Sequence, residues 1–431
     1  GWSGLREENV EQPVHQTYLI GDAGASPSEG PSAVLRLLKT ELSQASKASS
    51  AVFLGDNIYP GGMPPKGGEK RAAAEHALRM QTDALANYAG KVIFLPGNHD
   101  WYKYGLDGLD RQKDFLEDEL DIDKLWYPHI GCGGPEEIEV HENLTLVILD
   151  SQWWLENWNK HPRINKGCDM TNRIEFMRAF EEAIKGNKDR NVVVLMHHPL
   201  ETYGRHGGFF NFRDHMFPVP VLGSALSFFR ANAGTKQDLI HPAMQDLRSQ
   251  IKEIVQLKCN VTFASDHEHN LQYIERAGQQ FIVSGAASKA APSGTADGSL
   301  FAHGGRGYAR LDLYADGSMW VNFFGVNQEG TTQELLFRHH IKGQLVDSKE
   351  EIPTEFPIYE NGDTVVNRRM LDQEYERGGF GRFIMGDHYR STFSLNTDMP
   401  VLNLNNYKGG VVPVKQGGVT RPTLPGQGQP I

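Results

Sequence analysis

The sequence predicts an α/β protein with a largely buried sheet, and three observations support this. Short apolar runs of strand length alternate with helix-length stretches through about the first 325 residues. The runs are rich in β-branched and aliphatic residues and are bounded by Gly, Pro or polar residues, as buried strands are. Polar clusters follow several runs directly. Because ligands bind at the carboxyl ends of strands in such sheets, these clusters are candidate sites.

The elements can be placed in chain order. We expect seven strands, at Thr17–Ile20, Ala51–Leu54, Val92–Leu95, Leu144–Leu149, Val192–Met196, Val261–Ala264 and Phe281–Ser284. The helix-length stretches between them are Ser32–Ala48, Arg71–Tyr88, Arg111–Leu120, Asn172–Lys185 and Gln245–Leu257. Two further strands, Tyr308–Tyr314 and Met319–Phe324, flank an Asp-Gly pair, which predicts a hairpin.

Charge and composition narrow the function. The formal net charge of -11 argues against a nucleic-acid-binding surface, which is usually basic. An anionic substrate remains compatible with it, because metal ions can supply local positive charge. No apolar run is long enough to predict a transmembrane helix. The chain has three cysteines, Cys132, Cys168 and Cys259. The sequence leaves two possibilities open: a disulfide between Cys132 and Cys168, or three unpaired thiols.

Five strands are followed by clusters of potential metal ligands. The clusters are Gly21-Asp22-Ala23-Gly24, Gly55-Asp56-Asn57-Ile58-Tyr59, Pro96-Gly97-Asn98-His99-Asp100, His197-His198-Pro199 and Ser265-Asp266-His267-Glu268-His269-Asn270. Each alone could be an ordinary turn or helix cap. Together they supply carboxylate, amide, phenolate and imidazole groups, which suit Fe, Zn or Mn. Two such ions can clamp the attacking and leaving oxygens of a phosphoryl group.

These clusters resemble the motifs of the calcineurin-like metallophosphoesterases, and more closely those of the purple acid phosphatases. The family pattern GDxG, GDxxY, GNH(D/E), VxxH, GHxH occurs in this order between about residues 15 and 325. Asp266 replaces the glycine of the last motif, which changes the turn and removes no ligand. The resemblance implies a four-layer α/β/β/α sandwich, with an extended C-terminal segment after it.

The resemblance also implies a dinuclear metal site. The first metal would be bound by Asp22, Asp56, Tyr59 and His269, and the second by Asp56, Asn98, His197 and His267, with Asp56 bridging. Most family members carry a histidine where this chain has Gly24, whereas the purple enzymes carry the tyrosine seen at Tyr59. The phenolate favours Fe(III) at the first site, and Fe, Zn or Mn is expected at the second.

The activity implied is hydrolysis of phosphate monoesters on a small phosphorylated substrate. In the family a metal-bound hydroxide attacks phosphorus, and His99 would protonate the leaving oxygen or hold the phosphate. Two alternatives remain. The chain could be a phosphodiesterase or nucleotide hydrolase with the same metals, or an envelope-associated interaction module with a vestigial site. We expect no nucleic-acid polymer as partner.

Three regions are expected: an N-terminal extension (1–14), a catalytic domain (15–343) and a C-terminal accessory segment (344–431), partly extended or disordered. An aromatic-rich insertion, Tyr203–Phe229, would lie near the site. Gly409–Gly418, with the runs Asp387–Arg390 and Met399–Leu404, resembles a linker in Bacteroidetes proteins that joins a phosphoesterase to an outer-membrane barrel. This resemblance implies an exported, periplasmic or cell-surface protein, with an outer-membrane or envelope protein as partner.

Overall fold

The computed structural model describes residues 12–209, 235–256, 258 and 260–341, and the backbone of 364–367 and 411–414. The chain divides into two compact units. The first holds residues 1–202, 246–293 and 300–349, and the second holds 203–245, 294–299 and 350–431. The expected N-terminal extension, the aromatic insertion and the C-terminal segment lie mostly outside the described residues. Both sheets described next belong almost entirely to the first unit.

One sheet has six strands in the order β13-β12-β11-β1-β2-β3. Their bounds are β1 His15–Ile20, β2 Ser49–Phe53, β3 Lys91–Phe94, β11 Gly307–Leu313, β12 Met319–Val326 and β13 Gln333–His340. Strands β1, β2 and β3 are parallel, so their carboxyl ends reach the same edge. Strand β11 pairs antiparallel with β1, and the expected hairpin joins it to β12.

The other sheet has seven strands in the order β10-β8-β9-β7-β6-β5-β4. Their bounds are β4 Glu136–His141, β5 Leu144–Ile148, β6 Asn191–Leu195, β7 Val261–Ser265, β8 Leu271–Arg276, β9 Gln279–Ser284 and β10 Ser299–His303. Strands β5, β6, β7 and β9 are parallel, whereas β4 pairs antiparallel with β5 and β8 pairs antiparallel with β9.

The main core lies between the two sheets. Alternate residues of each strand face it, because side chains in a strand point to opposite sides in turn. The alternation is clearest in β11 and β5, where every second residue joins one buried cluster: Ala309, Leu311, Leu313, Leu144, Leu146 and Ile148. Burying such aliphatic side chains supplies the main stabilisation of the sandwich.

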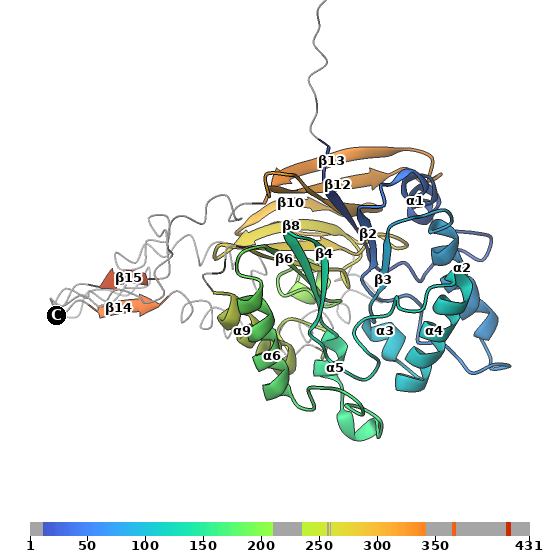
Figure 1. The fold of residues 1–431 in the computed structure, drawn as a ribbon, viewed down its shortest axis with the longest axis horizontal. Coiled ribbons are helices and arrows are strands. Elements are labelled where there is room, and N and C mark those ends of the chain that lie inside the picture. The colour runs from blue at the N-terminus through green and yellow to red at the C-terminus, as the bar shows by residue number, and fades with distance from the viewer. Residues whose placement is uncertain are drawn as a thin grey trace, which may run out of the picture. The chain divides into compact units, whose positions relative to one another are not determined.

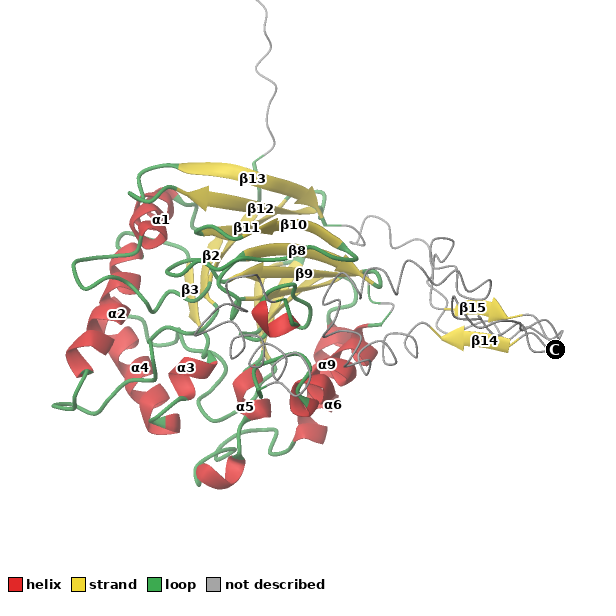
Figure 2. Ribbon diagram, turned by 180° about the vertical axis from the view of Figure 1, so that it is seen from behind, coloured by secondary structure: helices red, strands yellow, loops and turns green. Residues whose placement is uncertain are grey.

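Helices cover the outer side of each sheet. Helices α1 (Ala33–Gln44), α2 (Arg71–Ala84) and α4 (Gly105–Leu120) lie beside β1–β3, and α6 (Arg173–Gly186) and α9 (Pro242–Val255) lie beside the seven-stranded sheet (Figures 1 and 2). Short helices α3 (Asn98–Trp101) and α5 (Ser151–Leu155) follow β3 and β5. The layers are therefore helix, sheet, sheet, helix, which confirms the predicted four-layer sandwich.

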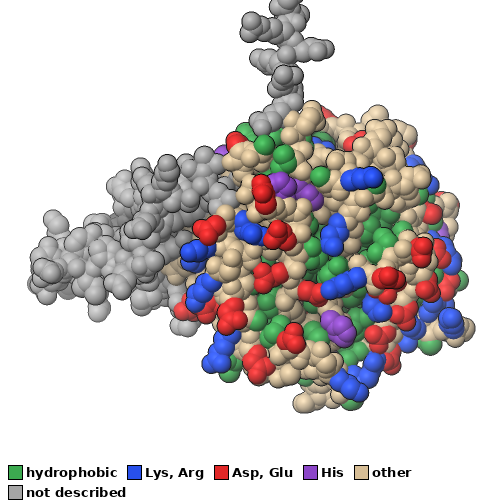
Figure 3. Space-filling view, viewed as in Figure 1, with side chains coloured by type: hydrophobic (Ala, Val, Ile, Leu, Met, Phe, Trp, Pro, Cys, Tyr) green, Lys and Arg blue, Asp and Glu red, His purple; other side chains and the backbone are tan. Residues whose placement is uncertain are grey.

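Several local features complete the description. Cys132 and Cys168 form a disulfide, which settles the pairing that the sequence left open. Among the described residues, no helix has the length and apolarity that crossing a membrane requires. Acidic and basic side chains are interspersed over the face shown in Figure 3. In the second unit, strand β14 (Thr364–Asn367) pairs antiparallel with β15 (Val411–Val414).

Candidate metal centre

Three of the predicted ligands follow the carboxyl ends of parallel strands in a strained backbone conformation. Asp22 follows β1, Asp56 follows β2 and His267 follows β7, and their φ angles are 55°, 52° and 57°. Non-glycine residues rarely adopt positive φ, and such residues cluster at functional sites because the surrounding structure must hold them there. Three of the predicted ligands therefore carry an independent structural sign of function.

Gly24 has no room for a side chain. A Cβ there would lie 2.4 Å from the carbonyl carbon of Asn57 and 2.6 Å from the carbonyl oxygen of Asp56. The Gly24 N–H donates a hydrogen bond of 3.0 Å to that same Asp56 oxygen. The loop after β1 thus packs directly on the loop after β2, so the histidine found here in most relatives could not be accommodated without a shift of the backbone.

One group of ligand atoms forms around Asp22. The Tyr59 hydroxyl donates a 2.5 Å hydrogen bond to Asp22 Oδ1. His269 Nε2 lies 3.3 Å from the Tyr59 hydroxyl and 3.5 Å from Asp22 Oδ1. Burial raises the pKa of Tyr59 well above its usual range, and the charges of Asp22 and Asp56 add to the rise. A bound cation would have the opposite effect, since it favours the phenolate.

A second group forms around His197. Its Nε2 lies 2.8 Å from Asn98 Oδ1, 3.0 Å from His267 Nδ1 and 3.4 Å from Asp56 Oδ1. Asp56 therefore belongs to this group, while its charge also acts on Tyr59 of the first group. All seven residues predicted as ligands are thus brought together in two groups with Asp56 between them. That they bind metal stays a prediction.

The spacing and burial of these atoms suit metal ions. Ligand bonds of about 2.1 Å that meet at about 90–110° place neighbouring ligand atoms about 3.0–3.4 Å apart, close to most of the separations seen here. Asp22 is fully buried, and among the described residues its Oδ2 has no hydrogen-bond partner. A buried carboxylate oxygen without a donor is costly unless a cation binds it.

Asp266 orients His197 from behind. Its Oδ1 lies 2.7 Å from His197 Nδ1, and its Oδ2 accepts a 3.0 Å hydrogen bond from the Asp22 N–H. Burial disfavours a charged imidazole, but the carboxylates of Asp266 and Asp56 outweigh this effect and raise the pKa of His197 to about 10. The surroundings of His197 Nε2 are therefore negative enough to favour a positive charge at this atom, carried either by a proton or by a cation. The replacement of a family glycine by Asp266 signalled a change here, but its contact with His197 was not predicted.

His99 lies beside the two groups and is accessible. Its side chain is 29% exposed, and Nε2 lies 3.9 Å from Asp56 Oδ2. Its Nδ1 lies 2.7 Å from the Pro60 carbonyl oxygen, which can only accept, so Nδ1 carries a proton and donates it. The neighbouring Asp100 is buried and accepts hydrogen bonds from the N–H groups of Asn57 and Gly97, which joins the loops after β2 and β3.

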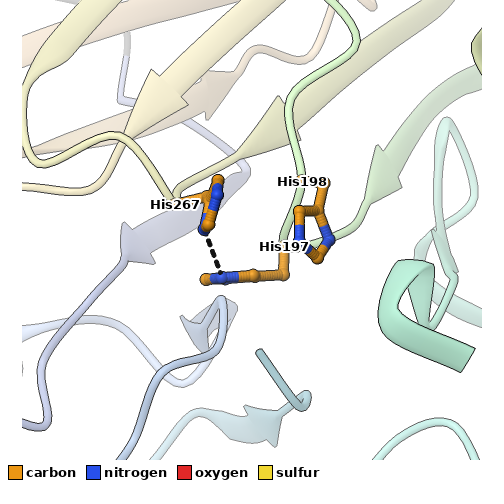
Figure 4. Close-up of side chains that lie close together, drawn as sticks. All are labelled: His197, His198 and His267. Atoms are coloured by element: carbon orange, nitrogen blue, oxygen red, sulfur yellow. Dashed lines mark hydrogen bonds between the residues drawn. The ribbon is translucent and has the colours of Figure 1, made fainter. Parts of the chain in front are cut away.

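A third imidazole adjoins the second group. His198 follows His197, and ligand nitrogens of His197, His198 and His267 all lie within 4.8 Å of one another (Figure 4). His198 Nδ1 lies 2.8 Å from the Ser151 hydroxyl, which also accepts a hydrogen bond from the His198 N–H. The first residue of α5 therefore fixes the direction of this ring.

Lys289 is a cation that no motif predicted. It lies in the loop after β9, a parallel strand, and its Nζ is 3.0 Å from the centroid of the Tyr59 ring. Burial lowers the pKa of Lys289, although the charges of Asp22 and Asp56 act in the opposite direction. The rule that sites form at the carboxyl ends of parallel strands could have pointed to this loop.

Comparisons with known proteins identify several similar solved structures, whereas no curated protein matches the chain. They include GAP50, "the anchor in the inner membrane complex of Plasmodium" (13% identity, 80% of this chain and 99% of that chain covered, TM-score 0.44). They also include purple acid phosphatase PPD1 from yellow lupin, Lupinus luteus, with 12% identity, 77% of this chain and 54% of that chain covered, and a TM-score of 0.47. PhoD has 10% identity, 78% of this chain and 71% of that chain covered, and a TM-score of 0.47.

The family match covers the first four of the five motifs. Residues 16–222 match the model of the calcineurin-like phosphoesterases. His267 and His269 come after the matched range and follow strand β7, which pairs with the strand β6 that precedes His197. Residues 16–222 are therefore similar to the calcineurin-like phosphoesterases, and the two-sheet fold described above is consistent with that similarity.

Proposed function

We propose that the chain hydrolyses phosphate monoesters at a site that holds two metal ions. The observation that carries the proposal is the position of Asp56, which lies 3.4 Å from His197 of one ligand group and acts by its charge on Tyr59 of the other. Asp22, Asp56, Tyr59 and His269 would hold one ion, and Asp56, Asn98, His197 and His267 the other. When bound, the ions lower the pKa of water and neutralise charge on phosphoryl oxygens.

The protein groups contribute binding, orientation and a proton. His99 would hold a proton on Nε2 and deliver it to the leaving oxygen, since Nδ1 is already engaged with Pro60. Asp266 would keep the His197 ring in position to hold the second ion, because a ligand held by a further hydrogen bond loses less freedom on binding.

We also propose iron at the first site, of the purple acid phosphatase type. Tyr59 supports this assignment because its hydroxyl faces Asp22 and His269, and the packing at Gly24 excludes a histidine there. A tyrosinate bound to Fe(III) absorbs visible light. Zn or Mn suits the second site as well as Fe does, because its donors are imidazole, amide and carboxylate.

The test combines activity and metal analysis on one sample of the full chain. Elemental analysis should give two metal ions per chain, at least one of them iron, with a visible band that Tyr59→Phe abolishes. An aryl phosphate monoester should be cleaved faster than the matching diester or a nucleotide, and Asp56→Asn should abolish cleavage without unfolding the chain. Preference for the diester would replace the monoester assignment by a phosphodiesterase. A colourless protein that holds two zinc or manganese ions would contradict the assignment of iron to the first site.

Export of the protein is a further part of the proposal. The Cys132–Cys168 disulfide supports it, because disulfides persist in oxidising compartments. Docking to an outer-membrane or envelope protein through residues 344–431 is proposed on the sequence resemblance. A pull-down from envelope fractions with the full chain, compared with a chain lacking these residues, tests this docking.

A further inference from the structure

The position of Lys289 is fixed by the residues on both sides of it. On one side, the Ser288 hydroxyl donates to the carbonyl oxygen of Asp22 and accepts a 3.1 Å hydrogen bond from the Ala25 N–H. On the other side, the Ala291 N–H donates a 2.7 Å hydrogen bond to the His269 carbonyl oxygen. The loop that carries Lys289 is therefore tied to the backbones of two residues in the first ligand group.

The ammonium group of Lys289 is close to the ligand groups, and it contacts an aromatic ring. It lies over Tyr59, and among the described residues no carboxylate lies within ion-pair distance of it. A lysine over an aromatic ring at a partly buried position is held by a contact that is weaker than a charged hydrogen bond. Its three N–H donors therefore remain suited to an anionic ligand.

The charges around Lys289 indicate which kind of anion would bind most strongly. Asp22 and Asp56 act on Lys289 by their charge, and in the domain these carboxylates are the proposed metal ligands. Metal cations would offset their negative charge, which leaves the ammonium as an additional positive charge beside Tyr59. A phosphate monoester near neutral pH carries close to two negative charges, whereas a diester carries one.

We propose that Lys289 binds a phosphoryl oxygen of the substrate and selects phosphate monoesters over diesters. This inference rests on the proposed phosphoesterase function and names the substrate class for it. The selection follows from charge and space together. The ammonium attracts the second negative charge of a monoester, whereas in a diester the corresponding oxygen is uncharged and carries a substituent.

The test compares Lys289→Met with Lys289→Arg in the metal-loaded full chain. The substrates are an aryl phosphate monoester and the diester with the same aryl leaving group. We expect Lys289→Met to lower kcat/KM for the monoester by about 10- to 100-fold, the range for losing one hydrogen bond to a charged group, mainly through KM. For the diester the loss should stay below about threefold. Lys289→Arg should retain most of the monoester preference, because it keeps the charge.

Lys91→Met is the matched control. Lys91 begins β3, and its Nζ lies 5.9 Å from the centroid of the Tyr127 ring, so it is also a lysine over a tyrosine. It lies at the amino end of its strand, whereas the ligands follow the carboxyl ends. Replacement of Lys91 should leave kcat/KM unchanged for both substrates. An equal loss for monoester and diester with Lys289→Met would overturn the proposal.

Binding of inorganic phosphate supplies a readout that does not depend on turnover. Calorimetry on the metal-loaded chain should show about 10- to 100-fold weaker phosphate binding for Lys289→Met than for the wild type. Unchanged phosphate affinity together with a shifted visible band would mean that Lys289 acts on Tyr59 instead, which also overturns the proposal. If the wild type cleaves neither ester, the proposed function fails, and the phosphate titration still decides the role of Lys289.

Discussion

The main chain and the side chain of His99 make separate contacts at the site. Its N–H donates a 2.9 Å hydrogen bond to Asp56 Oδ1, and its ring nitrogen Nδ1 is held by the Pro60 carbonyl. The main chain of His99 thus helps to place the carboxylate proposed to bridge the metals. Its remaining nitrogen, Nε2, is the atom that can meet a leaving group. Backbone and side chain therefore have separate roles, and substitution of the side chain tests only the second.

We expect His99→Ala to lower turnover by roughly 10²–10⁴-fold, the range for a general acid, while both metals stay bound. The loss should shrink for esters with good leaving groups, because these depart without a proton. Turnover over a series of aryl phosphates, with metal analysis of each sample, checks this. His76→Ala is a suitable control, because His76 also contacts a proline carbonyl, at 2.7 Å. A loss that is equal across the series would indicate phosphate positioning.

Asp266 couples the two ligand groups, since one carboxylate contacts His197 and the backbone of Asp22. We expect Asp266→Asn to weaken retention of the second metal by about 10- to 100-fold, because a neutral amide no longer holds the imidazole as a carboxylate does. Equilibrium dialysis against a chelator, followed by elemental analysis, measures this, and the tyrosinate band of the first metal should remain.

Asp312→Asn is the control for Asp266. Asp312 is also a buried carboxylate, but it bonds Arg310 and Gln16 on the six-stranded sheet. It should keep both metals even where it lowers stability. Equal metal loss in both variants would show that the effect of Asp266→Asn is a general loss of folding stability.

At the scale of elements, β1 and β2 are joined by a buried histidine. His15 in β1 is 3% exposed, and its Nε2 lies 3.1 Å from the Ser50 hydroxyl of β2. Burial, with a smaller effect of His141, lowers the pKa of His15 from 6.5 to about 4. The unfolded chain therefore binds a proton between these pH values that the folded chain does not. The stability that depends on neutral His15 is complete above pH 6.5 and is lost as the pH falls towards 4.

The predicted consequence is measurable by urea unfolding at about pH 7 and about pH 5. For a pKa difference of this size, the free energy of unfolding should fall by about 2 kcal/mol more in the wild type than in His15→Gln over this interval. The glutamine cannot titrate but can still bond Ser50. The same fall in wild type and His15→Gln would show that other groups cause the acid sensitivity.

The sequence predicted elements well where both faces of a strand are buried. The nine expected strands and five expected helices all occur, with ends shifted by a few residues. In the two large sheets, strands β4, β8, β10 and β13 were not predicted. Three of them are sheet edges, and β4 and β13 carry several charged or polar side chains because one face is partly exposed, so a search for continuous apolar runs passes over them.

The sequence predicted the motifs of the candidate site, but it did not predict the contacts that hold the motif residues in place. Five motifs in order locate the residues proposed as ligands, since each motif follows a strand whose end the apolar pattern marks. The contact between Asp266 and His197 spans 69 residues, and only the pairing of β6 with β7 brings the two together. Lys289 is a single lysine among small residues, and its position over Tyr59 depends on how the β9 loop packs against the β1 loop.

At the scale of the whole molecule, the sandwich is completed by β13. The sequence placed the last hairpin of the sheet near Phe324, but β13 extends the sheet to His340. Ile341 then follows, fully buried in the core between the sheets, and its N–H donates a 2.9 Å hydrogen bond to the Met319 carbonyl. These contacts place the end of the sheet just before the predicted domain boundary at 343. The boundary itself stays a prediction.

We therefore predict that a chain ending at residue 345 keeps the function and that a chain ending at residue 331 does not. The first retains β13 and Ile341. The second leaves β12 as an open edge and exposes Phe323, which packs on Phe337 with ring centroids 6.3 Å apart. Solubility, metal content and hydrolysis of an aryl phosphate should match the full chain for the first and fail for the second. Loss of metals or activity in the chain ending at 345 would mean that residues 346–431 belong to the catalytic domain, since the shorter control already accounts for loss of the sheet edge.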